Sequence, residues 1–577
     1  MSPTTVPGNF VIQSPAANDP LLDLNTQPSL DLQFATSKTL DDRVSGLPLV
    51  DHQRDASGSN SPGTYVGSDG LIKTSKVNLL RYSEEFNDTY WFKRNSAAIV
   101  PNAVVSPDGN TTADELQHPG GSTYARIETT GATPSVTLNA SYSFTIYAKY
   151  KPSSDANYLA IQFQRASGVS YINLSTKTVD SGDGDVELLG SGWIRFRRTL
   201  VATSTGTNQV YIYPTNTTNT SPINIAANAG LYIWGAQLEE GSTASSYIKT
   251  TNLPSAAPRF DHDPTTNASL GLLVEESREN LVTDSASANN WVTFSSGAVS
   301  ASTTVCPDGS TDATRLTASA LNDGAYKTFT APSSGDYIGS CYARTRTGVA
   351  TDVKVALSGP TGSTVTLPAD GTWIRVIGTS SSLGAGNKYL SVRSAAAAID
   401  IDVWGLQAEF GAFPTSYIPT SGSTVTRAAD AASITGSNFS RWYNQGEGTF
   451  IATHEETSTR NVIGAVYGGG AQLRLFSYLN TTRVQFLYGS GTGYFGYSSS
   501  PSSPPAYVKT AFYYDGLSYG GTIQGLTPSN LTTTTAPSPS LFEIGRANNV
   551  YTFNGRIPRL TYYPYRLSDA TLQEITS

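Results

Sequence analysis

The sequence predicts an all-β, multidomain protein built largely of β-sandwiches. Short runs that alternate apolar and polar residues recur along the chain between Gly, Pro, Asn and Asp, which is the pattern of half-buried strands joined by turns. Charged residues make up 14% of the 577 positions, below the ~25% of an ordinary soluble domain, and 52 Gly and 31 Pro supply turn residues. A long segment also occurs twice, which indicates tandem duplication of one domain.

The duplicated segment predicts two jelly-roll sandwiches, residues 78–251 and 280–424. Each copy contains a Pro-Asp-Gly turn and closes on Trp-Gly-x-Gln-x-Glu, at 107–109 and 234–239 in the first copy and at 307–309 and 404–409 in the second. Within the copies, alternating runs predict strands at 143–147, 158–163, 210–213, 353–357 and 399–404. Tryptophans at equivalent positions of the two copies are expected to pack in the cores: Trp193, Trp234, Trp373 and Trp404.

Three further parts lie outside the copies. Residues 1–27 contain several prolines and no periodic pattern, so we expect an N-terminal arm that could attach to a larger particle. A strand pattern follows from Leu30 to Phe34. The last segment, 425–577, ends on a predicted helix from Asp569 to Ile575 that Ser568 can cap.

No motif of the chain predicts an enzyme. Gly516–Gly520 fits the Gly-x-Ser-x-Gly pattern of a nucleophile elbow, but an elbow needs a strand before it and a helix after it. Here the flanking residues predict a hairpin. Glycoside hydrolysis needs two carboxyl groups that flank the scissile bond, and 425–577 lacks the alternating acidic strand that would supply them.

Charge and cysteine content exclude other classes of function. The net charge of −8, with no Lys/Arg-rich run, argues against nucleic-acid binding. No apolar stretch is long enough to span a bilayer, and the first residues lack the basic and apolar parts of a signal peptide. Cys306 and Cys341 leave two alternatives open, a bridge within the second copy or two buried thiols.

Two sets of residues are candidate binding sites. Aromatic rings can stack on the C–H faces of sugars, so tyrosines in a Gly/Ser-rich part of the last segment are predicted glycan contacts, with cross-strand pairing as the alternative: Tyr467, Tyr478, Tyr488, Tyr494 and Tyr497. Ca²⁺ prefers oxygen ligands in loops, so acidic residues near the two Pro-Asp-Gly turns are candidate ligands of a structural Ca²⁺, with turn formation as the alternative: Asp108 with Asp114, and Asp308 with Asp312. No other cofactor is expected.

Three runs of the chain resemble a sequence found in many virion proteins of tailed phages: Thr64–Thr74, Ala256–Leu281 and Ser416–Asp430. The first two runs usually lie close together in that family. The resemblance therefore implies that 28–77 and 252–279 form one attachment segment, into which 78–251 is inserted with its ends together. Within these runs, a salt bridge is the expected role of Glu275, and a turn or interface that of His262.

The domains themselves resemble known sandwiches. The two copies resemble the jelly rolls of carbohydrate-binding modules. Residues 425–577 resemble laminin-G/concanavalin-type domains through Gly555–Ile557 and the closing run Arg566–Gln573.

These resemblances imply a structural virion protein, foremost a tail fibre or appendage at the particle surface. Its N-terminal region would dock on other virion proteins, its last domain would bind host-surface polysaccharide, and it would form a homotrimer as such fibres usually do. Release of virions by lysis would explain the lack of a signal peptide. The alternatives are a capsid-decoration or baseplate component without receptor binding and, less favoured, an extracellular glycan-degrading enzyme.

Overall fold

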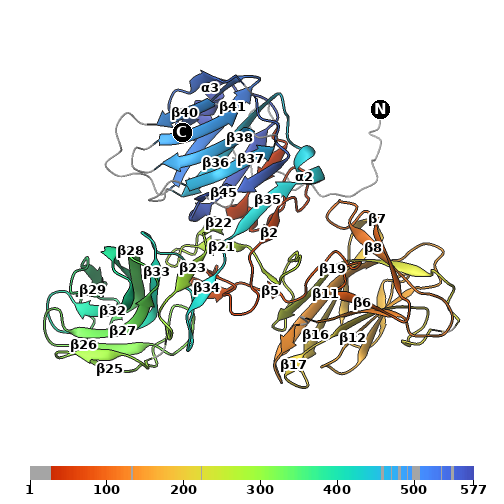
Figure 1. Cartoon of the computed structure of the whole chain (residues 1–577), viewed down its shortest axis with the longest axis horizontal. Coiled ribbons are helices and arrows are strands. Elements are labelled where there is room, and N and C mark those ends of the chain that lie inside the picture. Colours follow the sequence, from red (N-terminus) through yellow and green to blue (C-terminus); the bar gives the residue numbers. More distant parts are fainter. Residues whose placement is uncertain are drawn as a thin grey trace.

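A computed structural model describes residues 27–577 except 132–133, 223, 287, 456–460, 469–470, 479–482, 490, 497–506, 535 and 548–550. The fold is all-β, as predicted, with three sandwich lobes arranged around a small central region (Figure 1). Helices are short: α1 (Phe34–Ser37), α2 (Gly436–Ser440), α3 (Asp569–Thr576) and the 3₁₀ turn η1 (Gly190–Gly192). No helix in the described part of the chain is long and apolar enough to cross a bilayer.

The first repeat is a sandwich of two antiparallel six-stranded sheets. One sheet has the order β15 (Asp185–Leu188), β16 (Trp193–Val201), β11 (Ser141–Lys149), β19 (Gly230–Glu240), β8 (Ala113–Gln117), β7 (Ala98–Val104). The other has the order β14 (Thr178–Ser181), β13 (Val169–Asn173), β12 (Tyr158–Phe163), β18 (Val210–Thr215), β9 (Arg126–Thr129), β6 (Trp91–Arg94). The short strands β10 (Ser135–Val136) and β17 (Gly206–Thr207) pair separately.

The second repeat has the same strand order without β14 and β15, which add one edge strand to each sheet of the first. Its sheets are β25 (Ala298–Ala301), β26 (Thr314–Ala318), β33 (Ile399–Phe410), β28 (Gly335–Thr345), β31 (Ile374–Leu383), and β24 (Val292–Phe294), β27 (Gly324–Ala331), β32 (Gly386–Ser394), β29 (Thr351–Leu357), β30 (Val365–Leu367). All five strand runs predicted from alternation lie inside strands of these sheets.

Three of the four equivalent tryptophans pack in the cores as predicted. Trp193, Trp234 and Trp404 are at most 3% exposed. Trp373 is only half-buried, although its indole Nε1 donates to the Val305 carbonyl (3.0 Å) just as that of Trp193 donates to the Val105 carbonyl (3.1 Å).

The terminal sandwich is built from both ends of the chain. Its sheets are β1 (Leu30–Leu32), β48 (Arg559–Tyr563), β36 (Glu447–Glu455), β41 (Tyr507–Asp515), β42 (Ser518–Ile523), β43 (Ser529–Thr532), and β2 (Asp51–Gln53), β35 (Ala431–Thr435), β44 (Leu541–Ile544), β37 (Asn461–Gly468), β38 (Ala471–Tyr478), β39 (Arg483–Gly489), β40 (Gly491–Gly496). Segment 28–77, expected as part of an attachment segment, therefore supplies two strands to this sandwich, and Leu30, Leu32 and Phe34 lie in its core.

Short strand pairs form the central region between the lobes. They are β21 (Arg259–His262) with β22 (Ser269–Val274) and β47 (Gly555–Ile557), β3 (Thr64–Val66) with β4 (Ile72–Thr74), β5 (Val77–Asn78) with β20 (Ser255–Ala256), and β23 (Arg278–Asn280) with β34 (Val425–Arg427). The β5–β20 and β23–β34 pairs bring together the two ends of the first and second repeats. Each repeat thus leaves and re-enters the central region at one place (Figure 1).

Two local predictions for the last segment are confirmed. Ser568 caps α3, accepting a hydrogen bond from the Thr571 amide at 3.2 Å. Strands β41 and β42 form a hairpin across Gly516, in which Asp515 pairs with Ser518, so the Gly-x-Ser-x-Gly run is a turn. One further pair, β45 (Arg546–Ala547) with β46 (Tyr551–Thr552), closes this lobe.

Candidate functional site

The outer face of one sheet of the first repeat carries exposed aromatic rings. Trp91, Ile127 and Ile212 point into the core, so the neighbouring residues of β6, β9 and β18 point outward. These outward residues are Phe92, Arg94, Arg126, Glu128, Tyr211 and Tyr213. Phe92 is 46% exposed, and Tyr124, just before β9, is 45% exposed. We call Phe92, Tyr124, Arg126 and Tyr211 the aromatic face.

Arg126 holds Tyr124 and Tyr211 of the aromatic face in place, and Arg94 lies over Phe92 at 5.2 Å. The Arg126 guanidinium carbon lies 4.3 Å from the ring centroid of Tyr211 and 5.6 Å from that of Tyr124, within the range of cation–π attraction. Its Nη1 donates to the Tyr213 hydroxyl (2.9 Å), which donates to Gln162 Oε1 (2.9 Å). Because these side chains are already fixed, a ligand would bind with little loss of side-chain entropy.

A buried carboxylate anchors the basic side chains of this surface. Glu128 is 2% exposed and accepts hydrogen bonds from Arg94 Nη2 (2.5 Å) and Arg126 Nε (2.6 Å). Phe92 and Tyr211 are its cross-strand partners on the two sides. Two guanidinium groups thus share one carboxylate, which leaves the surface rigid and with one surplus positive charge.

The second repeat has a related but more closed surface on the equivalent sheet. Arg393 lies over the ring of Phe294 at 4.2 Å, and Tyr326 packs against Tyr389 at 4.9 Å between ring centroids. These rings are half-buried against one another. The first repeat therefore offers the more accessible rings to a ligand.

The predicted glycan tyrosines cannot be compared with this face. Tyr467, Tyr478, Tyr488 and Tyr494 lie in β37, β38, β39 and β40, but their side chains, like the whole of Tyr497, lie outside the described residues. Their role stays a prediction. The aromatic face was missed because its rings come from separate short runs, which become one surface only when β6, β9 and β18 pair side by side.

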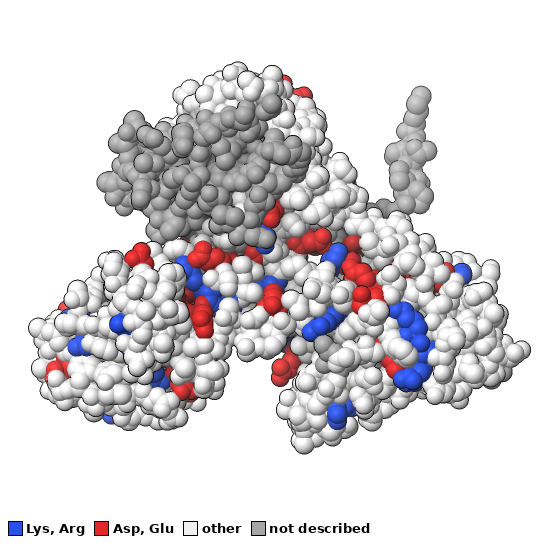
Figure 2. All heavy atoms as spheres, in the orientation of Figure 1, with Lys and Arg blue, Asp and Glu red and all other residues white. Residues whose placement is uncertain are grey.

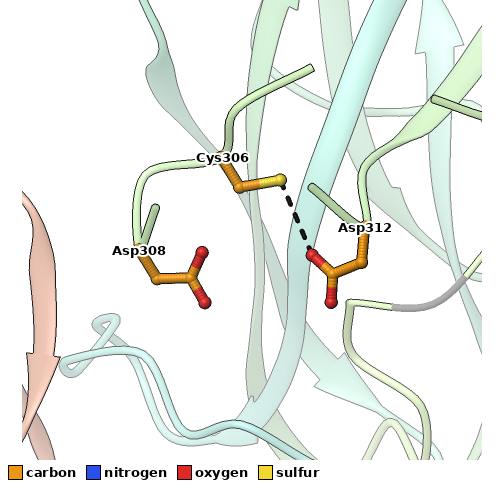
Figure 3. A group of neighbouring side chains, drawn as sticks. All are labelled: Cys306, Asp308 and Asp312. Carbon is orange, nitrogen blue, oxygen red and sulfur yellow. Dashed lines mark hydrogen bonds between the residues drawn. The ribbon is translucent and has the colours of Figure 1, made fainter. Parts of the chain in front are cut away.

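The Pro-Asp-Gly turn of the second repeat brings two of the predicted calcium ligands together. Potential ligand atoms of Cys306, Asp308 and Asp312 lie within 4.8 Å of one another, and their side chains turn toward a common space (Figure 3). However, Asp312 Oδ1 already accepts from Trp404 Nε1 (3.0 Å) and Ser310 Oγ (2.6 Å), and Asp308 accepts from the Ser310 amide. A thiol is also a poor ligand for Ca²⁺. The turn is explained without an ion, and calcium binding stays a prediction.

The first repeat treats the equivalent turn differently. Thr112 replaces Asp312 and accepts from Trp234 Nε1 at 3.1 Å. Asp108 accepts from Ser106 and Asn110, as a turn residue does. Asp114 accepts instead from the backbone amides of Phe86 and Asn102, both at 2.9 Å, and burial raises its pKa to about 6. The structure thus gives Asp108 and Asp114 separate partners rather than a common site.

The two cysteines are free buried thiols, which was one of the two predicted alternatives. Cys306 Sγ lies 3.6 Å from Asp312 Oδ1, and Cys341 is in the core of the second repeat. Burial raises the pKa of Cys306 to about 11 and that of Cys341 to about 12.

An ion-pair network occupies the junction of the central strands with the second repeat and the terminal sandwich. Arg259, fully buried on β21, donates to Glu275 Oε2 (2.6 Å), Asp430 Oδ2 (2.5 Å), Ser416 Oγ (2.7 Å) and the Thr64 carbonyl (3.0 Å). One guanidinium thereby ties together residues from the three runs 64–74, 256–281 and 416–430. Charged side chains are also visible on the surface around the junction (Figure 2).

Two more arginines complete this junction network. Arg54 pairs with Asp430, and Arg427 pairs with Glu275, and these guanidiniums are 0% exposed. Burial by itself would raise the pKa of Asp430, but Arg259 and Arg54 hold it well below its usual value. In the same way, Arg427 and Arg259 outweigh burial and lower the pKa of Glu275. The predicted salt-bridge role of Glu275 is confirmed.

His262, predicted to lie in a turn or at an interface, is in strand β21 beside β3. Its Nδ1 contacts the Val66 carbonyl at 3.0 Å, which joins β21 to β3. The adjacent Asp261 accepts from the Val66 amide (2.6 Å) and from Arg556 Nε (2.6 Å) on β47. His262 and Asp261 thus hold β21 against β3 and β47, which is a structural role.

Comparisons with known proteins report similarity in structure at low sequence identity. No protein-family model matches the chain, and no curated protein matches its sequence. The tandem CBM22-1–CBM22-2 domain of Paenibacillus barcinonensis Xyn10C is 11% identical, covering 59% of this chain and 99% of that one, with a TM-score of 0.25. An exo-β-1,3-galactanase of Phanerochaete chrysosporium is 12% identical over 53% of this chain and 68% of that one, with a TM-score of 0.16. The LG1–3 region of the laminin α2 chain is 9% identical over 75% of this chain and 93% of that one, with a TM-score of 0.15.

Proposed function

We propose that this chain binds glycans without cleaving them and that the aromatic face of the first repeat is a binding surface. The observation that carries the proposal is the exposure of Phe92 and Tyr124 beside the fixed Arg126. Exposed rings can stack on the apolar faces of sugars, and the guanidinium and phenol groups can donate to sugar hydroxyls. Such flat stacking surfaces suit an extended oligosaccharide better than a small compact ligand.

A glycan array with the full chain, followed by titration of the best oligosaccharide, tests this proposal. The variants Phe92→Ala and Tyr211→Ala should each weaken binding about tenfold, because each removes a ring at the centre of the surface. Leu188→Ala is the matched control, since Leu188 is 65% exposed on the other sheet of the same repeat. Unchanged affinity in both ring variants would place binding elsewhere. Release of reducing sugar by the wild type would refute the non-catalytic assignment.

The proposed setting is the surface of a tailed-phage particle, where the chain would act as a fibre or appendage that attaches to host polysaccharide. The support is the resemblance of 64–74, 256–281 and 416–430 to phage virion proteins. The N-terminal region would contact other virion proteins, and three copies would combine weak sites into higher avidity. Electron microscopy of particles labelled on this chain tests the location, and sedimentation equilibrium tests the trimer. Label on the capsid shell alone would favour a decoration protein.

A further inference from the structure

A cleft of about 280 Å³ opens at the junction of the second repeat, the central strands and the terminal sandwich. Tyr65 and Arg556 line it from the central strands β3 and β47, Tyr342 and Arg375 line it from the second repeat, and Glu455 lines it from β36 of the terminal sandwich. None of its lining residues comes from the first repeat, which carries the aromatic face. All three neighbouring parts of the fold must therefore be in place for the cleft to exist.

One wall of the cleft is held rigid by ion pairs. Arg556 Nε donates to Asp261 Oδ2 at 2.6 Å, and its Nη1 lies 2.9 Å and 3.1 Å from the two carboxylate oxygens of Glu455. The Arg556 amide also donates to Glu455 at 3.0 Å. Because Glu455 is still 27% exposed, this fixed carboxylate can accept further hydrogen bonds from a ligand.

The opposite wall keeps unused donors. Arg375 donates from Nη2 to Ser340 Oγ (3.0 Å), which is the one hydrogen bond of this guanidinium in the described part of the chain. Its Nε is buried, so Nη1 is the donor left for a ligand. Among the described residues, neither the Tyr342 hydroxyl nor the Tyr65 hydroxyl has a hydrogen-bond partner. Both rings are half-buried. A guanidinium and two phenols are thus available to a molecule in the cleft.

The equivalent arginine of the first repeat makes a hydrogen bond that Arg375 lacks in the described part of the chain. There the equivalent Arg195 lies over Tyr147 at 5.5 Å, as Arg375 lies over Tyr342 at 5.8 Å. Arg195, however, donates to the Ser245 carbonyl at 2.6 Å, a bond that Arg375 does not repeat within the described residues. In both arginines Nε lacks a partner among the described residues, and Nη2 donates to an equivalent hydroxyl, Thr145 or Ser340. The two copies therefore differ by the bond to Ser245, which leaves more of the Arg375 guanidinium free beside the cleft.

From these contacts we propose that the junction cleft binds a single neutral sugar ring, at a site separate from the aromatic face. Asp261 and Glu455 are offset by Arg556 and Arg375, and the third lining carboxylate, Glu275, is already paired with Arg259 and Arg427. No carboxylate among the described lining residues therefore lacks a guanidinium, which favours an uncharged ligand. Sugar hydroxyls both donate and accept, which matches a fixed acceptor wall opposite a donor wall. The volume lies just below the ~300–1,000 Å³ of typical ligand sites, which suits one ring rather than a chain.

The site deepens the proposed glycan binding but can be tested apart from it. The full chain is titrated calorimetrically with methyl β-D-glucopyranoside, methyl β-D-galactopyranoside, methyl α-D-mannopyranoside and D-glucuronate, with saturation-transfer NMR to detect weak contacts. Arg375→Lys should weaken binding of the preferred neutral glycoside about tenfold and Tyr342→Phe about fivefold. The matched controls are Arg195→Lys and Tyr147→Phe, the equivalent positions of the first repeat, which should leave the affinity unchanged.

The outcomes separate the two sites. Absence of binding by any neutral glycoside, or stronger binding of D-glucuronate, would overturn the cleft assignment. So would a neutral glycoside whose affinity is the same in wild type, Arg375→Lys and Tyr342→Phe. Loss of oligosaccharide binding in Phe92→Ala together with intact monosaccharide binding would support both sites. An unaffected Phe92→Ala variant would count against the aromatic face alone.

Discussion

Replacing Arg259 with Met tests whether the ion-pair network holds the central strands to the second repeat and the terminal sandwich. Methionine fills much of the side-chain volume but leaves Glu275 and Asp430 each with one fewer buried guanidinium. Removing one partner from a buried ion pair usually costs about 3–5 kcal/mol. Arg54 and Arg427 remain beside these carboxylates, so we expect the lower end, about 3 kcal/mol.

Hydrogen exchange measured by mass spectrometry is the suitable assay, because three lobes need not unfold in one transition. Peptides from β21, β22 and β34 should lose about a hundredfold in protection, which corresponds to about 3 kcal/mol. Peptides from β28 and β33, inside the core of the second repeat, should keep their protection, since their own sheet contacts are unchanged.

Arg315→Met is the matched control for Arg259→Met. Arg315 pairs with Asp400 at 2.8 Å, but the two side chains are 44% and 28% exposed. Exposed pairs contribute about 1 kcal/mol or less. If Arg259→Met changed the protection of the junction peptides no more than Arg315→Met does, the claim that the buried network organises the lobes would be wrong.

Three other predictions follow from the same contacts. Because folding lowers the pKa values of Asp430 and Glu275, these carboxylates stabilise the folded protein at any pH above their unfolded-state pKa of about 4. This stabilisation is lost as the pH falls from about 4 toward the lower folded-state pKa values. Junction protection should therefore drop between about pH 4 and pH 2, and less so in Asp430→Asn; a flat profile in the wild type would contradict this. Ser568→Ala should destabilise α3 by about 1 kcal/mol, seen as faster exchange in the last residues, because it removes the N-cap bond, whereas Ser568→Asp should not. Cys306 and Cys341, buried and with raised pKa values, should react with a thiol reagent at pH 8 only after urea is added; prompt labelling of Cys341 in the native protein would contradict its burial.

Local patterns predicted the individual lobes well. Alternation located strands such as 143–147 and 399–404, because one face of each strand packs on a core and the other does not. Ser568 marked the start of α3, and the Gly516 turn was recognisable as a hairpin from the residues beside it. These features depend on neighbours within a few positions, which a single sequence displays directly.

The candidate site was predicted only in part. The turn at Asp308 and Asp312 brings those residues together, because both lie in one loop. Asp108 and Asp114, predicted as a pair of calcium ligands, do not lie together. Thr112, not Asp114, occupies the position in the first repeat that Asp312 has in the second.

By itself, the sequence determined an all-β protein with two copies of one sandwich, and it marked three runs of residues that belong together. Only the tertiary structure decided that Leu30–Leu32 pairs with β48 at the far end of the chain, and that Arg259 joins Glu275 and Asp430 at the junction. The aromatic face and the junction cleft were also decided only by the tertiary structure. Their residues lie on strands that are far apart in sequence, and the alternation within a strand shows which side is exposed but not which other strand will lie beside it.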